Sequence, residues 1–185
     1  EKPILAQSSP WMNCGRHARF GRQKMNDNMQ EPLKIVLTPV RNEAWVLNAF
    51  LTATSLWADY IVIADQMSTD GSRDIAKRFP KVILVDNPNP VMNQANARWL
   101  LFQEADKRWL DEEKVLFCLD ADEFLSGDFI HADSWRRIMS VGAQNVAYCL
   151  KWIFVYGDIN TALDKQTNYM EWFGYFPKGT TVADL

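Results

Sequence analysis

The stretch LKIVLTPVRNEAWVLNAFLTATSLWADYIVIAD, residues 33–65, predicts a strand, a helix and a second strand. Residues 33–38 and 60–64 are short, β-branched apolar runs of the kind that buried strands require. For the helix between them we expect Asn42 as the N-cap and Glu43 in the first turn. The apolar-type positions of this helix recur at helical spacing and are Leu47, Phe50, Leu51 and Thr54.

The alternation of strands and helices continues to about residue 130. A polar loop at 65–72 contains the turn-forming pair Asp70-Gly71 and leads into a short helix that ends near Phe79. The next three expected elements are a strand over 81–85, a helix from about Asn93 to Leu110, and a strand over 114–119. Four strands linked in this way predict an α/β fold with a mainly parallel central sheet and helices on both faces.

Beyond residue 130 the pattern changes. We expect a helix around 133–141, a longer strand-like run at 145–157 and an aromatic segment at 168–176. Residues 1–31 show no steady period and are expected to form an N-terminal arm or tail, so the domain should span 32–185. The chain begins at Glu1 rather than at a methionine and stops abruptly, so truncation, above all at the C-terminus, stays open.

The composition argues against several classes of protein. With 185 residues and 48% hydrophobic content the chain can bury one core, and a net charge of -3 with a pI near 5.4 argues against nucleic-acid binding. Two histidines are too few for a His-built zinc site, and three separated cysteines indicate a reducing, cytoplasmic compartment. Residues 44–64 are too polar to span a membrane. The arm is mildly basic. It therefore leaves open two alternatives: peripheral association with the cytoplasmic face of a membrane, and pairing with a partner subunit.

Polar side chains follow three of the expected strands. Pro39, Arg41 and Glu43 follow the first, Asp65 follows the second, and LDADEF at 119–124 follows the fourth. Because ligands of open α/β sheets bind beyond the carboxyl ends of the strands, these clusters are expected to converge on one edge. Carboxylates at such an edge suit Mg²⁺ or Mn²⁺, which one or two carboxylates usually hold while phosphates of a ligand complete the shell.

Three stretches, in this order, resemble the family 2 glycosyltransferases of the GT-A fold: PVRNE at 39–43, ADQMSTDGS at 64–72 and LDADEF at 119–124. Typical members read Pro-x-Tyr-Asn-Glu, then Asp-Asp-Gly-Ser-Thr-Asp-Gly, then Asp-x-Asp. The resemblance covers about residues 33–130. It implies a GT-A-like, Rossmann-type sandwich that binds a nucleotide-sugar donor.

The resemblance also implies roles for individual residues. Asp65 would hydrogen-bond the nucleotide base, Asp122 would bind the metal directly, and Asp120 would reach the ribose or the metal shell. Arg98 matches a position where an arginine often meets the donor, and Glu123 would lie near the sugar without a clear role. The implied nucleotide-sugar site comprises Pro39, Arg41, Glu43, Asp65, Arg98 and Asp120, and the implied metal ligands are Asp122 and Asp120.

Two residues depart from the family pattern. Arg41 replaces the tyrosine that usually packs on the base, and Ala64 is interpreted as a replacement for the first acid of the Asp-Asp pair. Arginine can stack on a base, so the identity of the base stays open. Inverting members need a carboxylate base in their second half, often within Glu-Asp, and no such pair follows residue 130. The catalytic base is therefore unassigned, with three candidates that no motif supports: Asp158, Asp164 and Glu171.

Ordinary structural roles compete with some of these assignments. Asp70 is expected to serve its turn rather than a ligand, and Arg98 can equally be a solvated charge. Cys118 is expected to be a small buried hydrophobe. Aromatic side chains are expected in the core first, and those concerned are Trp99, Trp109 and the aromatics of 169–176.

Taken together, these features predict a metal-dependent glycosyltransferase of the hexosyltransferase type, with polysaccharide biosynthesis as its expected setting. It would move a sugar from a nucleoside-diphosphate donor to an unknown glycan, lipid or protein acceptor, using Mg²⁺ or Mn²⁺, and the family resemblance implies inversion of the anomeric centre. One alternative is a non-catalytic domain of the same fold that binds nucleotide-sugar or glycan. The other is a phosphatase of the haloacid dehalogenase type, although there Asp-x-Asp normally follows the first strand and here it follows the fourth.

Overall fold

The structure is a computed structural model that describes residues 31–91, 93–125, 127, 147–151, 154–155, 162–163 and 170–181. Residues 1–30 of the expected arm at 1–31 lie outside these residues, as does the helix expected around 133–141. So do two of the candidate bases, Asp158 and Asp164, while Glu171 has a described backbone and no described side chain.

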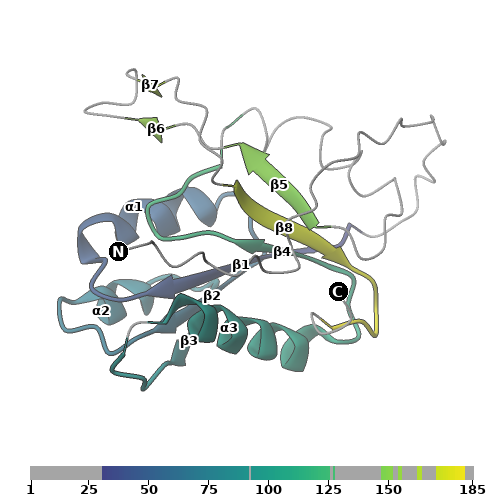
Figure 1. The fold of residues 1–185 in the computed structure, drawn as a ribbon, viewed down its shortest axis with the longest axis horizontal. Helices are drawn as coiled ribbons and strands as arrows, with labels where there is room; N and C mark the ends of the chain where they lie inside the picture. Colours follow the sequence, from purple (N-terminus) through teal and green to yellow (C-terminus); the bar gives the residue numbers. More distant parts are fainter. Residues whose placement is uncertain are drawn as a thin grey trace, which may run out of the picture.

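Six strands form one sheet in the order β3-β2-β1-β4-β8-β5 (Figure 1). Four of them are parallel neighbours: β1 (Leu33–Val40), β2 (Tyr60–Asp65), β3 (Val82–Asp86) and β4 (Lys114–Cys118). β8 (Met170–Phe176) is antiparallel to β4, and β5 (Ala147–Lys151) is antiparallel to β8. Two short strands pair separately and are β6 (Phe154–Val155) and β7 (Ala162–Leu163). The mainly parallel central sheet expected from the sequence is confirmed.

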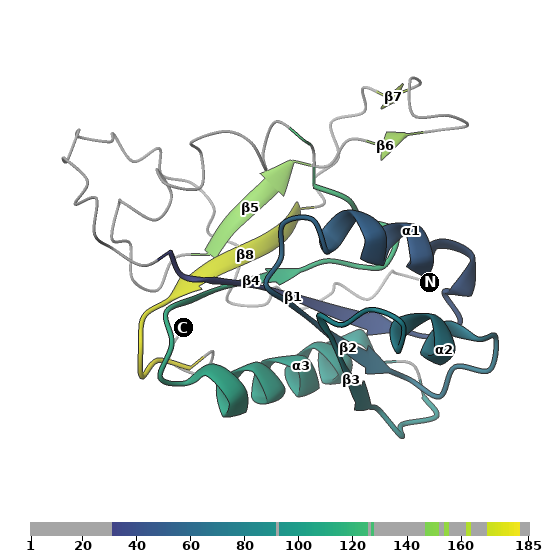
Figure 2. The ribbon, with the colours of Figure 1, turned by 180° about the vertical axis from the view of Figure 1, so that it is seen from behind.

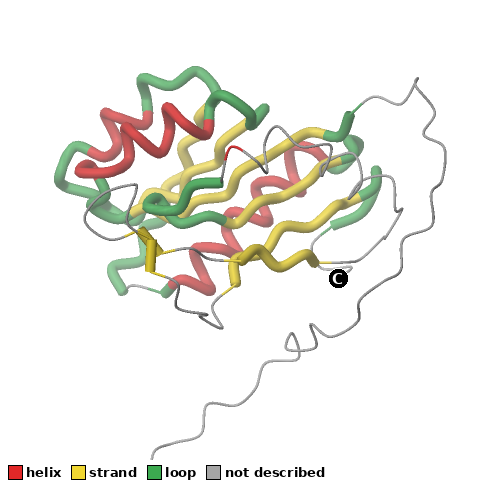
Figure 3. The backbone as a smooth tube through the Cα atoms, turned by 90° about the horizontal axis from the view of Figure 1, so that it is seen from above, coloured by secondary structure: helices red, strands yellow, loops and turns green. Residues whose placement is uncertain are grey.

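Helices cover both faces of this sheet, as Figures 1 and 2 show. They are α1 (Ala44–Thr54), α2 (Ser72–Ala76) and α3 (Gln94–Trp109). Because side chains of a strand alternate between faces, neighbouring residues such as Val36 and Leu37 enter different cores. Val36 packs with residues of α1 and α2, and Leu37 packs with residues of α3. This two-sided burial explains why the strands are continuous apolar runs rather than alternating ones. In Figure 3 the strands lie side by side, and a long helix passes behind them.

The expected buried faces of both long helices are confirmed. Leu47, Phe50, Leu51 and Thr54 of α1 are buried, as are Ala97, Leu101, Ala105 and Trp109 of α3. Cys118 is a buried free cysteine. Trp99 is 51% exposed, so its expected place in the core was wrong. It stands two residues from both Ala97 and Leu101, which is about 200° around a helix and puts it on the outer face.

The second half differs from the expectation in detail. The strand-like run at 145–157 divides into β5 and β6, and the aromatic segment supplies β8, which enters the main sheet beside β4. Within the described part of the chain, no helix has the length and apolar character that a membrane crossing needs.

Candidate functional site

The candidate site lies where the carboxyl ends of the parallel strands meet. β1 has β2 on one side and β4 on the other, so the chain reverses its direction of sheet growth between them. In open α/β sheets this switch point is where ligands bind. A pocket opens there, and its lining comes from the ends of β1, β2 and β4 and from the start of α3: Pro39, Val40, Arg41, Glu43, Gln66, Gln94, Ala97, Asp120, Ala121 and Asp122. Five of the expected site residues therefore share one pocket.

The two aspartates that follow β4 have different surroundings. Asp120 faces Arg98, with 3.2 Å between Oδ1 and Nη2, so Arg98 is an ion-pair partner rather than a solvated charge. The Asp120 backbone N–H donates to Oε2 of Glu123 at 2.8 Å, which closes the turn after the strand. Asp122 is exposed, and none of the described residues hydrogen-bonds to its carboxylate. It is therefore the acid that can accept a ligand without breaking an existing contact.

Glu43 adds a further carboxylate to this pocket. Burial raises its pKa, and the negative charges of Asp122, Asp70 and Asp120 raise it further, against a hydrogen bond from Trp45 that lowers it. The indole N–H of Trp45 donates to Oε2 of Glu43 at 3.0 Å. Mutual repulsion of this kind favours the binding of a cation.

These acids fit a hard divalent cation. No group of three or more His, Cys, Asp or Glu residues in the described part of the chain could enclose a metal ion. Mg²⁺ and Mn²⁺ do not need such a cage, because one or two carboxylates suffice when a phosphate ligand and water complete the shell. Asp122 and Asp120 could supply those carboxylates.

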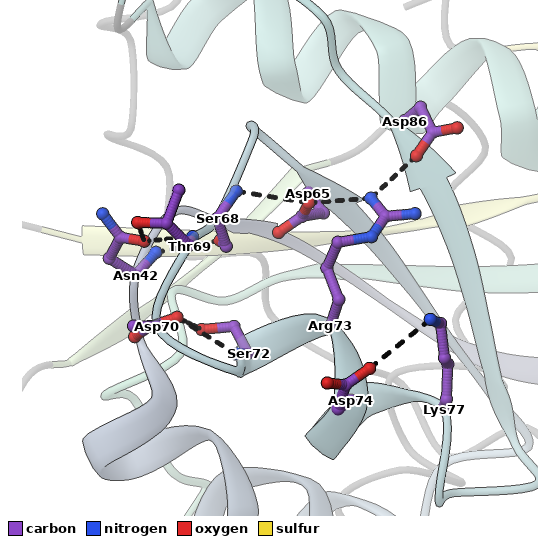
Figure 4. A network of polar contacts seen from close by, with 10 residues as sticks. All are labelled: Asn42, Asp65, Ser68, Thr69, Asp70, Ser72, Arg73, Asp74, Lys77 and Asp86. Carbon is purple, nitrogen blue, oxygen red and sulfur yellow. Dashed lines mark hydrogen bonds and ion pairs between the residues drawn. The ribbon is translucent and has the colours of Figure 1, made fainter.

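Asp65 lies apart from the pocket of the other acids. Its side chain is 1% exposed, and Oδ2 accepts a hydrogen bond from Nη1 of Arg73 at 2.8 Å (Figure 4). The Ser68 backbone N–H is 3.4 Å from the same oxygen, while Oδ1 has no hydrogen-bond partner among the described residues. Asp65 lines a second hollow at the ends of β2 and β3, together with Met67, Arg73, Asp86, Asn87 and Pro88.

The loop at 65–72 caps helix α1 from a distance. Three successive backbone N–H groups, of Asn42, Glu43 and Ala44, donate to Ser68 Oγ, Ser72 Oγ and Asp70 Oδ2 respectively. The expectation that Asn42 caps α1 was wrong, because this residue has a left-handed φ of 59° and its Oδ1 accepts from the Thr69 N–H instead. Glu43 is the N-cap residue and makes no side-chain cap. The Ser-Thr-Asp-Gly motif therefore fixes where α1 starts.

Asp70 has the turn role that the sequence predicts. Its Oδ1 accepts from both the backbone N–H and the hydroxyl of Ser72 (Figure 4). The hydroxyl contact is the main reason why the pKa of Asp70 is lowered. Gly71, with a φ of 96°, supplies the left-handed residue before α2.

The interpretation of Ala64 as a replaced acid was wrong. Ala64 is fully buried in the core beneath α3, and counting back from Ser68 places Met67 at the glycine of the family motif. Met67 has a φ of 55°, the left-handed conformation that suits glycine there. Asp65 is then the first acid of the pair, and Gln66 replaces the second.

Gln66 is a site residue that sequence reasoning missed. Its Nε2 donates to the carbonyl oxygens of Asn89 and Val91, each at 2.7 Å. Arg41 Nη1 donates to the carbonyl oxygen of Pro90 at 3.1 Å. These two residues hold the loop between β3 and α3 beside the pocket. A polar residue directly after Asp65, at the end of an apolar strand, was the available signal in the sequence.

Comparison with known proteins shows a family to which the sequence is similar and solved structures that the fold resembles. The sequence model of a family described as "Glycosyl transferase family 2" matches residues 35–132. A search of the curated proteins finds no match. Among solved structures, a mannosyltransferase from Pyrobaculum calidifontis in complex with GDP-Man and Mn²⁺ is similar, with a TM-score of 0.51 and 20% identity. The similarity covers 66% of this chain and 36% of that one, so this chain spans about a third of the length of the mannosyltransferase.

A second solved structure, of 4-diphosphocytidyl-2C-methyl-D-erythritol synthase, has a TM-score of 0.49 and 16% identity. It covers 82% of this chain, and the chain covers 78% of it. The first of these likenesses shows a fold shared with a GT-A-like enzyme, as expected from the sequence.

Proposed function

Because the chain belongs to glycosyltransferase family 2, we propose that it transfers a sugar from a nucleoside-diphosphate donor to an acceptor hydroxyl with the help of Mg²⁺ or Mn²⁺. The observation that carries the proposal is the exposed Asp122, which faces the switch-point pocket without a partner among the described residues. A cation bound there would neutralise the diphosphate as it leaves.

Several of the described residues would bind the donor together. Asp122 and Asp120 would hold the cation, and Arg98 keeps Asp120 in place through their ion pair. Arg41 lines the pocket and donates a hydrogen bond to the carbonyl oxygen of Pro90. Its planar guanidinium can stack on the base or bind a phosphate. The mannosyltransferase of this fold binds GDP-Man and Mn²⁺, so a nucleotide-sugar with Mn²⁺ is the first ligand pair to test.

A non-catalytic domain of the same fold is the second candidate. It is favoured by the sequence after residue 130, which contains no Glu-Asp pair to serve as the base of an inverting transfer. Such a domain would bind the same donor and cation. It would not release nucleoside diphosphate.

The first prediction concerns Asp122→Asn, a change that keeps shape and removes one negative charge from the proposed metal site. Metal stabilisation of a leaving diphosphate is worth several kcal/mol, so release of nucleoside diphosphate should fall about 100-fold or more. Mn²⁺ titration in the presence of nucleotide should show weaker binding, and the melting temperature should be unchanged.

Asp111→Asn is the matched control, because Asp111 is exposed and lies at the opposite end of β4. It should leave both turnover and Mn²⁺ affinity as in wild type. Equal Mn²⁺ affinity in wild type and Asp122→Asn would remove the metal site from this pocket. Donor binding without release of nucleoside diphosphate would favour the non-catalytic alternative.

A further inference from the structure

Four aromatic side chains are exposed in the described part of the chain, and two of them lie next to residues of the switch-point pocket. These two are Trp45, which is 76% exposed, and Phe124, which is 51% exposed. Tyr60 begins β2 at the opposite edge of the sheet, and Trp99 lies on the outer face of α3. Single exposed hydrophobic residues are common on proteins, but two beside one pocket are a candidate ligand surface.

Trp45 is held beside the pocket by a hydrogen bond. Its indole N–H donates to Oε2 of Glu43 at 3.0 Å, and Glu43 lines the pocket. A ring that is already held in place loses little conformational entropy when a ligand stacks on it. Oε1 of Glu43 has no partner among the described residues, so it can accept a hydrogen bond from the same ligand.

Helix α1 places Phe124 on the same side of the pocket. Phe124 follows Asp122 by two residues, and its ring packs edge-on against Phe50 of α1, with 6.1 Å between the ring centroids. Trp45 lies in the first turn of the same helix. Neither Trp45 nor Phe124 is among the described residues that line the pocket. These two rings, which we call the exposed aromatic pair, therefore lie outside the pocket on its α1 side.

A sugar suits this surface better than a lipid or a protein does. A pyranose ring has a face of C–H groups that packs on an aromatic ring, and its hydroxyl groups can donate to a carboxylate. An anionic lipid headgroup would be repelled by Glu43 and by the acids that act on it, Asp70, Asp120 and Asp122. A specific protein interface buries about 800 Å² on each partner, and one Trp and one Phe supply only about 150–250 Å² each.

We propose that the exposed aromatic pair is an acceptor site for a saccharide, with one sugar ring stacked on Trp45 and a neighbouring ring against Phe124. The inference rests on the proposed function and names its class of acceptor. In the proposed function Asp122 and the cation hold the diphosphate, so the donor sugar lies beside them. Phe124 is two residues from Asp122, and Trp45 is one hydrogen bond from the pocket. A saccharide on the pair can therefore present a hydroxyl to the donor sugar.

Nuclear magnetic resonance titration of the full chain tests this site without turnover. Each tryptophan gives one indole signal in a nitrogen–proton correlation spectrum, and loss of a signal in Trp45→Phe or Trp99→Phe assigns it. Cellohexaose, maltohexaose, chitohexaose and mannohexaose are added in turn to the protein with Mg²⁺ and GDP or UDP. At least one of them should shift the Trp45 signal and leave the Trp99 signal in place. If none of them shifts the Trp45 signal, the proposal is overturned.

Turnover with the saccharide that binds supplies the second test. Trp45→Ala should raise the KM for this saccharide about tenfold or more, because the stacking surface is lost. Trp45→Phe keeps an aromatic ring and should raise it less. Trp99→Ala is the matched control, since Trp99 is an exposed tryptophan on another helix, and it should keep the wild-type KM.

Two further outcomes would contradict the saccharide site. If Trp45→Phe and Trp45→Ala weaken nucleotide and saccharide binding by the same factor, Trp45 only positions Glu43. If wild type and Trp45→Ala transfer sugar equally well to a polyprenyl phosphate or a peptide, the transferase stands and its acceptor is not a saccharide.

Failure of the proposed function itself would look different. A saccharide would then shift the Trp45 signal, while no nucleotide would bind in the presence of Mn²⁺ or Mg²⁺. That result would keep the saccharide site and refute the transferase.

Discussion

The pKa of Glu43 reflects its burial and the charges of its acidic neighbours. Its pKa is raised, chiefly by burial and then by the charges of Asp122, Asp70 and Asp120. The folded state therefore binds a proton at Glu43 more tightly than the unfolded state does. Stability must then decrease as pH rises from the unfolded pKa of about 4.5 through the folded value.

Glu43→Gln should remove this pH dependence, since an amide does not titrate and its oxygen can still accept from Trp45. Melting temperatures of wild type should fall relative to the variant as pH rises above 4.5. Mn²⁺ should narrow the difference, because a cation favours the charged carboxylate. If the melting temperatures of the two proteins change with pH in the same way across this range, the repulsion between Glu43 and its acidic neighbours is wrongly assigned.

At this scale the sequence predicts which residues gather but not what each one contacts. Pro39, Arg41, Glu43, Asp120 and Asp122 lie at or just after the ends of β1 and β4, which are neighbours in the sheet, so their shared pocket follows from the order of the strands. The contacts of Asp65 with Arg73 do not follow, because they depend on where α2 places its side chains. Gln66 was missed although it directly follows an apolar strand, and its contacts with Asn89 and Val91 depend on the path of the loop between β3 and α3.

Helix α1 shows what can be predicted for an element and what cannot. Its buried face follows from helical spacing, and its start does not, because the capping groups come from the loop at 65–72. The start of α3 was predictable because its cap is local, with the Asn96 N–H donating to Oδ1 of Asn93 at 3.0 Å. A helix cap that lies within one turn of the helix can be predicted from the sequence. A cap that comes from a distant segment can be identified only when the fold is known.

Ser72→Ala tests this distant cap. Ser72 is buried, and its hydroxyl accepts from the Glu43 N–H at 2.9 Å and donates to Asp70 at 2.6 Å. Its loss should lower the free energy of unfolding by about 1–2 kcal/mol, because a cap is lost and a backbone donor is left unpaired. Denaturant unfolding measures the change.

Ser55→Ala is the control for the removal of a hydroxyl, because Ser55 lies at the other end of α1 and its buried Oγ has no hydrogen-bond partner in the part of the chain that the structure describes. It should change the free energy of unfolding by less than about 0.5 kcal/mol. If both variants lose the same stability, the hydroxyl of Ser72 does not cap α1.

For the molecule as a whole, the parallel half was predictable and the antiparallel half was not. Strands joined by helices leave few topologies, so the neighbours β1 to β4 follow from the order of elements. The segment at 168–176 read only as aromatic core, because a strand buried on both faces and a buried helix look alike over so short a run. Its pairing with β4 depends on contacts across about 60 residues of chain.

Lys114 joins these two halves and allows a test on the whole domain. It is completely buried at the start of β4, and its Nζ donates to the carbonyl oxygens of Trp109 and Thr180, each at 3.1 Å. Burial lowers the pKa of Lys114 below its usual 10.5, against the opposing charge of Asp106. The unfolded state therefore binds this proton more tightly, and stability should rise as pH approaches 10.5 from below.

Lys114→Met should abolish this rise in stability with pH, because methionine has no titratable group and its side chain has a similar length. Denaturant unfolding at a series of pH values up to 10.5 compares the slopes of the two proteins. Lys34→Met is the control, since Lys34 follows Leu33, the register partner of Lys114 in β1, and pairs with Glu31 and Asp59 nearer the surface. A slope that persists in Lys114→Met would mean that another group releases its proton on folding.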